Sequence, residues 1–245
     1  MDLTKRTGKE LVVGDTGSGL IADLGSKDKI TRTRAHDALL ALREEAVRLL
    51  VKALSNPNDT IRWEAARLLD EIGVAWTKHA DEETINALIS DLHSKDGRVR
   101  VRARLALVAI GGKAVEALEH ALASKHAECR WEAAKALGRI GDPAATGVLV
   151  KSIEDDVFEI RWLATEGLIG IGYPALRPLL NELIRRPDSI WLREGAHRIL
   201  HGIEKQDILN IVHPVLKALE ETDAHLKVPF AAQNALTKLE DKGIK

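Results

Sequence analysis

A frame of spaced residues recurs seven times along this chain of 245 residues and constrains its fold more than any other feature. In each copy an apolar residue precedes Arg (Thr31 in the first copy), Ala follows the Arg by three positions, Leu by seven, and Ile or Leu by ten. These offsets place the spaced residues on one stripe of an α-helix and are incompatible with strand alternation. The frames centre on Arg32, Arg62, Arg100, Arg130, Arg161 and Arg193, with Pro229 in the Arg position of the last copy.

The spacing of the frames predicts the architecture. Positions 32, 62, 100, 130, 161, 193 and 229 lie 30 to 38 residues apart, and a second helical pattern, such as Leu149 and Ile153, lies between successive frames. Repeats of this length are typical of solenoids, in which each unit packs on its neighbours. We therefore predict an all-α fold, a right-handed α-solenoid of about seven helix pairs over residues 17–245, after a loose segment at residues 1–16. A longer outer helix is expected before the seventh frame.

Composition narrows the functional classes. Charged residues make up 30% of the chain and the net charge is −1, so a uniformly basic surface for nucleic acid or anionic membrane is not indicated. The sequence contains no run of about 20 apolar residues, so no membrane span is predicted. The single cysteine, Cys129, takes an apolar frame position, which excludes an intrachain disulfide and fits a reducing compartment. We predict a cytoplasmic protein, with no prediction of its oligomeric state.

The frame also carries a family resemblance. The segment 130–143, from Arg130 to Pro143, closely resembles a HEAT-like repeat of the phycobilisome-lyase type, and residues 61–73 and 160–172 look similar. The resemblance covers roughly residues 17–241 and implies an armadillo-like α-solenoid whose Arg-bearing helices line a concave side. It also implies that each Arg braces the turn between helices, with Asp28 and Asp96 as candidate acceptors. The residues of this structural ladder are Arg62, Arg100, Arg130, Arg161 and Arg193.

Aromatic residues give the best indication of a binding site. They make up only 3% of the chain, yet every Phe, and every Trp except Trp76, falls where the Arg-bearing helices would face solvent. Because Trp is favoured at binding hot spots, we predict a concave partner-binding face, with an apolar anchor between the fifth and sixth copies. Sideways packing on the next repeat is the alternative for Trp63, Trp131 and Trp162. The candidate residues are Trp63, Trp131, Phe158, Trp162, Leu163, Ile190, Trp191, Arg102, Lys135 and Arg198.

Charges on the same face argue against a nucleic-acid partner. Acidic and basic residues alternate there, which weakens the phosphate attraction that dominates nucleic-acid affinity. A related solenoid can act as an alkyl-base DNA glycosylase, but that activity needs a basic cleft with a catalytic carboxylate. Neither a nucleic-acid nor a membrane partner is predicted.

Catalytic and metal-binding patterns are weak. His197 and His201 stand four residues apart on one helical face, a spacing that can hold zinc, but no third ligand is evident nearby in the sequence. No His-Glu dipeptide occurs, and the di-iron hydroxylases built on HEAT-like repeats use such pairs. The turn at residues 15–18 matches the aspartic-protease motif, but that chemistry needs two such turns in a β-fold. We predict no catalytic residue, no metal and no cofactor.

Together these observations favour a non-enzymatic scaffold or adaptor that binds a protein or peptide on its concave face. The resemblance implies one alternative, a bilin lyase-like or tetrapyrrole-chaperone protein acting on phycobiliproteins. In that case the rings would face the pigment, and Arg or Lys would meet its propionates.

Overall fold

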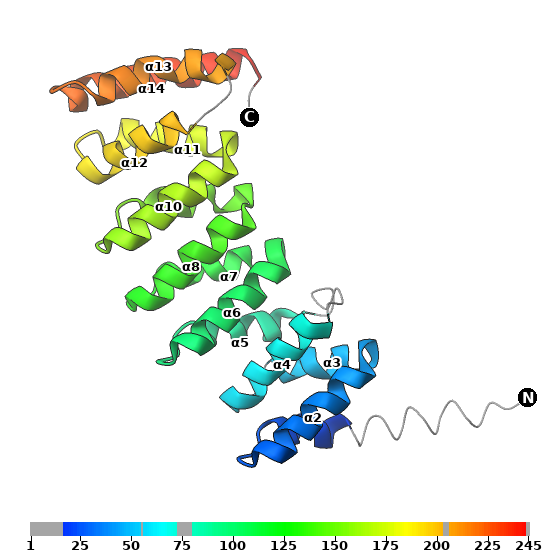
Figure 1. Cartoon of the computed structure of the whole chain (residues 1–245). Coiled ribbons are helices and arrows are strands. Elements are labelled where there is room, and N and C mark those ends of the chain that lie inside the picture. The colour runs from blue at the N-terminus through cyan, green and yellow to red at the C-terminus, as the bar shows by residue number, and fades with distance from the viewer. Residues whose placement is uncertain (1–16, 55, 73–79, 203–205, 244–245) are drawn as a thin grey trace, which may run out of the picture. The chain divides into compact units, whose positions relative to one another are not determined.

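The computed structural model describes residues 17–54, 56–72, 80–202 and 206–243. This part of the chain consists of helices joined by short turns and contains no strand (Figure 1). The segment 1–16, expected to be loose, and the loop that carries Trp76 lie outside the described residues. After a first helix over residues 17–24, the order is α2 (Lys29–Leu42), α3 (Glu44–Ala53), α4 (Asp59–Ile72), α5 (Glu82–Asp91), α6 (Gly97–Ile110), α7 (Val115–Ala121), α8 (Ala127–Ile140), α9 (Thr146–Ser152), α10 (Phe158–Ile171), α11 (Leu176–Arg185), α12 (Ile190–His201), α13 (Gln206–Leu219) and α14 (Ala224–Asp241).

The chain divides into two compact units. The first spans Met1–Ile110 and contains α2 to α6, and the second spans Gly111–Lys245 and contains α7 to α14. Short 3₁₀ turns precede α7, α9 and α11 in the second unit. The predicted all-α fold built from helix pairs is confirmed. The prediction that residues 17–245 form one continuous array stays a prediction.

Each frame places its central Ala and Leu in the core. In α10, Ile160, Ala164 and Leu168 have no exposed surface, because the stripe faces both the paired helix α9 and the neighbouring α8. Small Ala at the centre of the stripe lets the helices approach, and Leu fills the space between them. Within the second unit, α8, α10 and α12 therefore lie side by side, with α9 and α11 packed behind them (Figure 1).

Local sequence signals end and begin the helices. Gly141 follows α8 with φ 68°, the left-handed conformation that glycine adopts without a Cβ clash. Asp142 then accepts a hydrogen bond from the backbone N–H of Ala144, with Pro143 at the first position of the next turn. Ser189 caps α12 in the same way, by accepting from the N–H of Leu192.

The last pair departs from the expected order. The sequence predicted that α13 would be the outer helix, but α13 packs against the Arg-bearing helix α12, and α14 packs against the outer helix α11. The two helices have exchanged layers. Pro229, which replaces Arg in this frame, lies inside α14. The exchange brings the end of α13 beside α12, where it contributes to a side-chain cluster described below.

Candidate functional site

The frame arginines share one contact. In six repeats the guanidinium Nη1 donates to the backbone carbonyl six residues earlier, in the turn before its own helix. Such bonds satisfy carbonyl oxygens in the turn and fix its geometry. The six donor–acceptor pairs are Arg32–Ser26, Arg62–Asn56, Arg100–Ser94, Arg130–Ser124, Arg161–Asp155 and Arg193–Pro187, at 2.6 to 3.0 Å.

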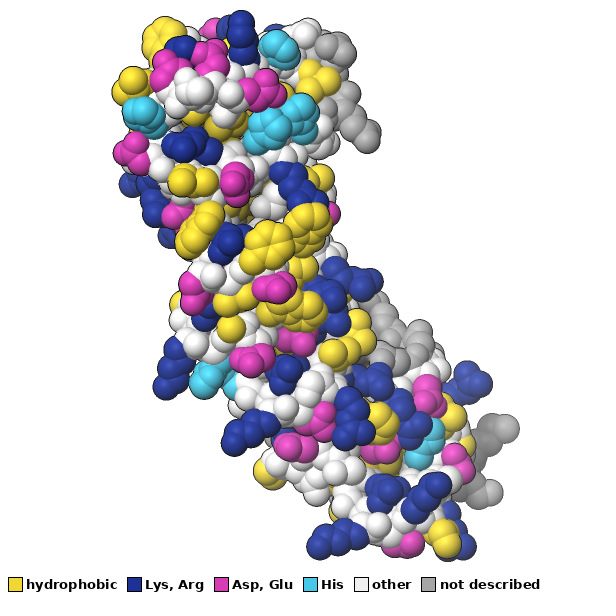
Figure 2. All heavy atoms as spheres, turned by 60° about the vertical axis from the view of Figure 1, so that its left-hand side comes forward, with side chains coloured by type: hydrophobic (Ala, Val, Ile, Leu, Met, Phe, Trp, Pro, Cys, Tyr) yellow, Lys and Arg dark blue, Asp and Glu magenta, His cyan; other side chains and the backbone are white. Residues whose placement is uncertain are grey.

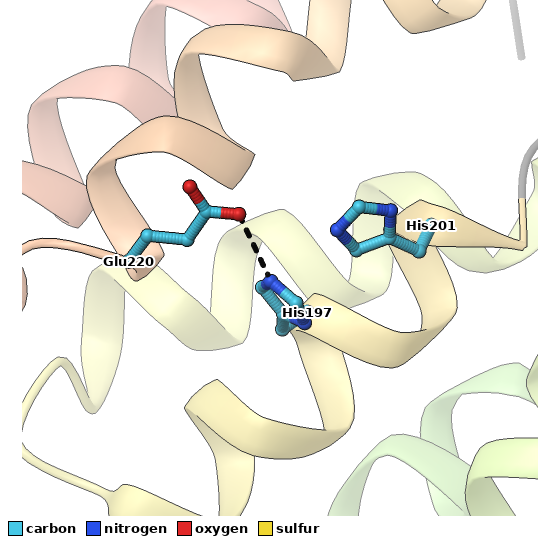
Figure 3. A group of neighbouring side chains, drawn as sticks. All are labelled: His197, His201 and Glu220. Atoms are coloured by element: carbon cyan, nitrogen blue, oxygen red, sulfur yellow. Dashed lines mark hydrogen bonds and ion pairs between the residues drawn. The ribbon is translucent and has the colours of Figure 1, made fainter.

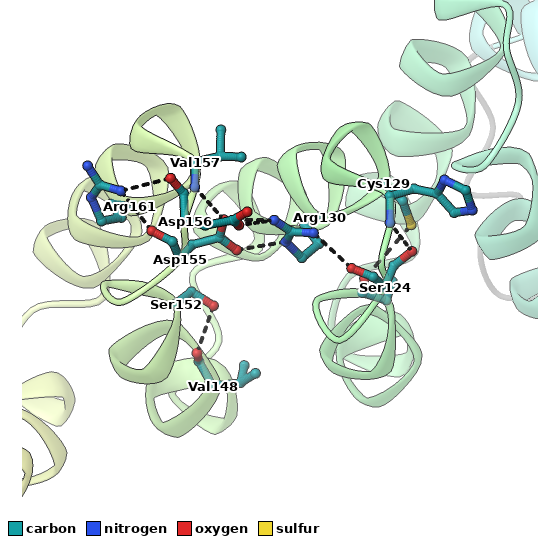
Figure 4. A network of polar contacts seen from close by, with 11 residues as sticks. Ser124, Cys129, Arg130, Val148, Ser152, Asp155, Asp156, Val157 and Arg161 are labelled. Atoms are coloured by element: carbon teal, nitrogen blue, oxygen red, sulfur yellow. Dashed lines mark hydrogen bonds and ion pairs between the residues drawn. The ribbon is translucent and has the colours of Figure 1, made fainter.

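Two of these arginines also bind a carboxylate of the following repeat. Arg62 donates to Asp91, with Nε–Oδ2 at 2.7 Å, and Arg130 donates to Asp155, with Nε–Oδ2 also at 2.7 Å (Figure 4). Asp28 and Asp96 were the acceptors suggested by the sequence. They instead accept hydrogen bonds from the backbone N–H groups of their own helices.

The environments of the two buried carboxylates differ. Burial raises the pKa of Asp91, and the hydrogen bonds from Arg62 offset this only in part. Burial also acts to raise the pKa of Asp155, but the hydrogen bonds from Arg130 and the N–H of Val157 outweigh it, so the pKa lies below its usual value. The hydrogen bonds from Arg130 and from the Val157 N–H both favour the charged form of Asp155, and so favour its ion pair with Arg130.

An aromatic surface lies on α10 and α12, defined by Phe158, Trp162, Ile190 and Trp191. Their exposed fractions are 60%, 41%, 62% and 43%, large values for apolar side chains. The rings of Phe158 and Trp162, one turn apart on α10, have centroids 6.4 Å apart. In Figure 2, hydrophobic side chains gather near the middle of the view with Lys and Arg side chains among them.

Arginine side chains stack on the indoles of the aromatic surface. The guanidinium carbon of Arg161 lies 4.3 Å from the ring centroid of Trp191, and that of Arg198 lies 3.2 Å from the centroid of Trp162. Arg198 is itself held by an ion pair with Glu166, with Nη2–Oε1 at 3.0 Å. Guanidinium groups attract the negative face of an indole ring. The two tryptophans are therefore fixed by neighbours on the adjacent helix.

Two hollows meet at Trp191. One, of about 120 Å³, lies between α10 and α12 and is lined by Trp162 and Trp191 among others, with Ile153 and Gly195 also in its lining. The other is open and of about 630 Å³, and its lining residues are Glu154, Arg186, Asp188, Ser189, Ile190 and Trp191. Since Trp191 lines both hollows, an occupant of one would contact the same ring as an occupant of the other.

The other predicted site residues are distributed over the two units. Trp63 and Arg102 lie in the first unit, where the guanidinium of Arg102 on α6 is 5.5 Å from the Trp63 ring on α4. That ring thus packs sideways onto the next repeat. In the second unit, Lys135 lies 4.4 Å from the ring centroid of Trp131, on the same helix. Leu163 is half-buried on α10, beside Trp162.

Charge around the aromatic surface is mixed. Arg161, Arg198 and Glu194 line the smaller hollow, while Glu154, Arg186 and Asp188 line the larger one. Alternating signs of this kind give no continuous track for a phosphate backbone. Among the described helices, none is both long and apolar enough to cross a membrane. The cytoplasmic location stays a prediction.

The structure brings together a cluster of possible metal ligands that could not be fully predicted from the sequence. His197 and His201 on α12 are joined by Glu220, the residue after α13, and one ligand atom from each lies within 4.8 Å of the others (Figure 3). The sequence indicated the two histidines but no third ligand. Glu220 is 19 residues beyond His201 and reaches it only through the exchanged layers of the last helix pair.

Comparison with known proteins identifies the repeat. A family profile described as HEAT repeats matches residues 85–169 and 115–201. A chain in a solved structure of Kap95p with RanGDP superposes with a TM-score of 0.52 at 12% identity, covering 96% of this chain and 37% of that one. A likeness at this identity shows the fold, an α-solenoid of helical repeats.

Curated relatives correct one prediction. Deoxyhypusine hydroxylases of Drosophila pseudoobscura pseudoobscura and Drosophila melanogaster are 33% and 32% identical to this chain over 111 residues. Each match covers 43% of this chain and 37% of the relative, so this chain aligns with well under half of either relative's length. The relatives are enzymes. The prediction of a non-enzymatic protein is therefore wrong, because the likeness points toward an enzyme. The repeat type is given by the profile and the fold: residues 85–201 match HEAT repeats, within an α-solenoid of helical repeats.

Proposed function

We propose that the protein binds a segment of a partner protein on the aromatic surface of α10 and α12. The observation that carries the proposal is the pair of exposed indoles, Trp162 and Trp191, each stacked on a guanidinium and both lining one hollow. Trp and Arg are the residue types most enriched at binding hot spots. The proposal concerns binding and is compatible with an enzymatic role.

The fixed rings favour tight binding. An exposed side chain that must be ordered on binding loses conformational entropy, which weakens the complex. Arg161 and Arg198 hold the indoles before any partner arrives, so this loss is small. Phe158 and Ile190, the most exposed members of the surface, would be covered by the partner and would add apolar burial around the indoles.

The chemistry of the surface indicates the kind of segment. An apolar anchor side chain suits the smaller hollow between Trp162 and Trp191, whose lining also includes Ile153 and Gly195. Glu194 and Arg198 at the same hollow can satisfy polar groups of the segment's backbone. The mixed charges favour a peptide over a polyanion.

The experiment compares capture by matched variants. Wild-type protein, the double variant Trp162→Ala/Trp191→Ala and the control Phe230→Ala are used to capture partners from native lysate, quantified by mass spectrometry. Phe230 is an exposed ring on α14, outside the aromatic surface. The double variant should retain its helical circular dichroism and bind at least about tenfold more weakly, or ~1.4 kcal/mol.

A photo-crosslink localises the contact. Ile190→p-benzoyl-phenylalanine places a reactive group at the edge of the aromatic surface and should crosslink the same partner that the double variant loses. Equal capture by all three proteins, or crosslinking of unrelated proteins, would contradict the binding site.

An enzymatic role is the second candidate, because the curated relatives are deoxyhypusine hydroxylases. We propose to test it directly by incubating the protein with Fe(II), dioxygen, a reductant and a deoxyhypusine-containing protein, and by detecting hydroxylation with mass spectrometry. The 245 residues contain no His-Glu dipeptide, so any such activity would need other iron ligands. If wild-type protein forms product and the Trp162→Ala/Trp191→Ala variant does not, the aromatic surface binds the substrate protein of the enzyme. Absence of product would contradict a deoxyhypusine hydroxylase activity of this chain.

The bilin-related alternative stays a prediction with a simple test. A visible absorption band after mixing the protein with an open-chain tetrapyrrole would favour it, and the absence of a band would count against it.

A further inference from the structure

The cluster of His197, His201 and Glu220 has the composition of a metal site. Two imidazoles and one carboxylate supply three ligand atoms, all within 4.8 Å of one another. The Nε2 atom of His197 lies 3.3 Å from Oε1 of Glu220, and the two imidazole rings have centroids 4.4 Å apart (Figure 3). Nitrogen and oxygen ligands of this kind suit zinc and neighbouring first-row divalent ions.

The distances agree with coordination geometry. Zinc binds imidazole nitrogen and carboxylate oxygen at about 2.0–2.2 Å, so two ligands of one tetrahedral ion lie about 3.4 Å apart. The distance from Nε2 of His197 to Oε1 of Glu220 is already close to this value, at 3.3 Å. His201 and Glu220 are exposed, so a rotation of these side chains can close the remaining distance without disturbing the core.

The packing of two helices positions the ligands. His197 and His201 are one turn apart on α12 and so share a face of that helix. Glu220 directly follows α13, which packs against α12. A cluster drawn from two packed elements holds its ligands closer to a fixed geometry than three residues of one loop would.

We propose that His197, His201 and Glu220 bind a divalent transition-metal ion such as Zn²⁺. Three protein ligands leave one position of a tetrahedral ion for water or for an oxygen of a bound ligand. The bound ion would also join α12 to the end of α13. This proposal does not depend on partner binding at the aromatic surface, which uses different side chains.

The experiment uses the purified 245-residue protein without a histidine tag, freed of metal with a chelator. Zn²⁺ binding is measured by calorimetry, and Co²⁺ is used as a spectroscopic probe because its visible absorption reports coordination number. Wild-type protein should bind one ion, with the intense bands of tetrahedral Co²⁺. His201→Ala and Glu220→Gln should each weaken Zn²⁺ binding at least about tenfold and reduce the bands. Both residues are exposed, so the fold should be retained.

A matched control separates the site from nonspecific histidine binding. His120→Ala removes an exposed histidine of α7 outside the cluster and should bind like wild type. Thermal unfolding gives a second readout, because Zn²⁺ should raise the melting temperature of wild type and His120→Ala but not of Glu220→Gln. Equal Zn²⁺ affinity in wild type, His201→Ala and Glu220→Gln would overturn the proposal.

Discussion

The guanidinium of Arg161 contacts both the turn of its own repeat and the ring of Trp191 in the next. Its Nη1 donates to the carbonyl oxygen of Asp155 at 2.7 Å, and its central carbon lies 4.3 Å from the indole centroid. One frame arginine therefore braces the backbone and supports an exposed ring at the same time. The repeat framework and the aromatic surface are linked through this side chain.

This double role predicts a double effect of Arg161→Ala. Loss of the hydrogen bond costs about 1 kcal/mol of unfolding free energy, and loss of the cation–π contact costs about 0.5–1 kcal/mol more. The Trp191 ring should also become more mobile. Urea unfolding measures the loss of unfolding free energy, and acrylamide quenching of tryptophan fluorescence measures the mobility of the Trp191 ring. Arg193→Ala, which removes the bond to Pro187 in the next repeat, is the control and should leave the quenching unchanged.

Two glycines set the distance between α8 and α10. A Cβ added at Gly167 would lie 3.0 Å from the Cα of Gly138, and the reverse distance is 3.1 Å. Backbone atoms cannot move aside as side chains do, so Gly167→Ala should push the helices apart. We expect a loss of about 1–3 kcal/mol in unfolding free energy, despite the better helix propensity of Ala.

Gly170 of the same helix supplies the matched control. A Cβ there meets nothing within 4 Å, so Gly170→Ala should stabilise the protein by about 0.5–1 kcal/mol through helix propensity alone. Chemical denaturation of Gly167→Ala and Gly170→Ala measures both changes in unfolding free energy. Similar effects of the two substitutions would show that the contact between Gly138 and Gly167 does not control the packing.

The lowered pKa of Asp155 predicts a pH-dependent stability. A carboxyl whose pKa is lower in the folded state stabilises the protein above its unfolded pKa of about 3.9, and this contribution is lost as the pH falls through the folded pKa. Asp155→Asn should therefore cost about 1–2 kcal/mol at pH 7. The difference from wild type should shrink as the pH falls below about 4, measured by urea unfolding at several pH values.

Asp156 also contacts Arg130, but it is far more exposed than Asp155. Its side chain is 84% exposed and contacts Nη2 of Arg130, whereas that of Asp155 is 9% exposed. Solvent screens an exposed pair, so Asp156→Asn should change the unfolding free energy by less than about 1 kcal/mol. If Asp155→Asn were equally mild, the ion pair of Arg130 and Asp155 would not stabilise the repeat.

Among single substitutions, we expect truncation of the frame leucines to cause the largest losses of unfolding free energy. Leu137 is fully buried in α8, and Leu137→Ala should lower the unfolding free energy by about 2–5 kcal/mol because a cavity remains. Exposed Leu226 on α14 is the control, and Leu226→Ala should have little effect. Chemical denaturation followed by circular dichroism measures both, and comparable small losses would place Leu137 outside the core.

Much of the fold could be predicted from the sequence, because its signals are local. The offsets from Arg161 to Ala164 and Leu168 define one helical stripe, and that stripe is buried. Gly141 and Asp142 mark a helix end and a helix start through their own backbone preferences. The sequence also indicated Trp162 and Trp191 as candidates, since position in the repeat predicts which side chains face solvent.

Contacts between repeats became visible only in the folded chain. The carboxylate that accepts from Arg130 is Asp155, 25 residues away. Spacing in the sequence does not distinguish this acceptor from Asp96 or Asp28, which cap their own helices. The approach of Gly138 to Gly167 depends on how two helices cross. Helix positions and their buried Ala and Leu residues follow from spacing along one segment of chain, and so could be inferred from the residue pattern. The exchanged layers of α13 and α14, and with them the contact of Glu220 with His197, depend on how whole helices pack and could not be read from residue spacing.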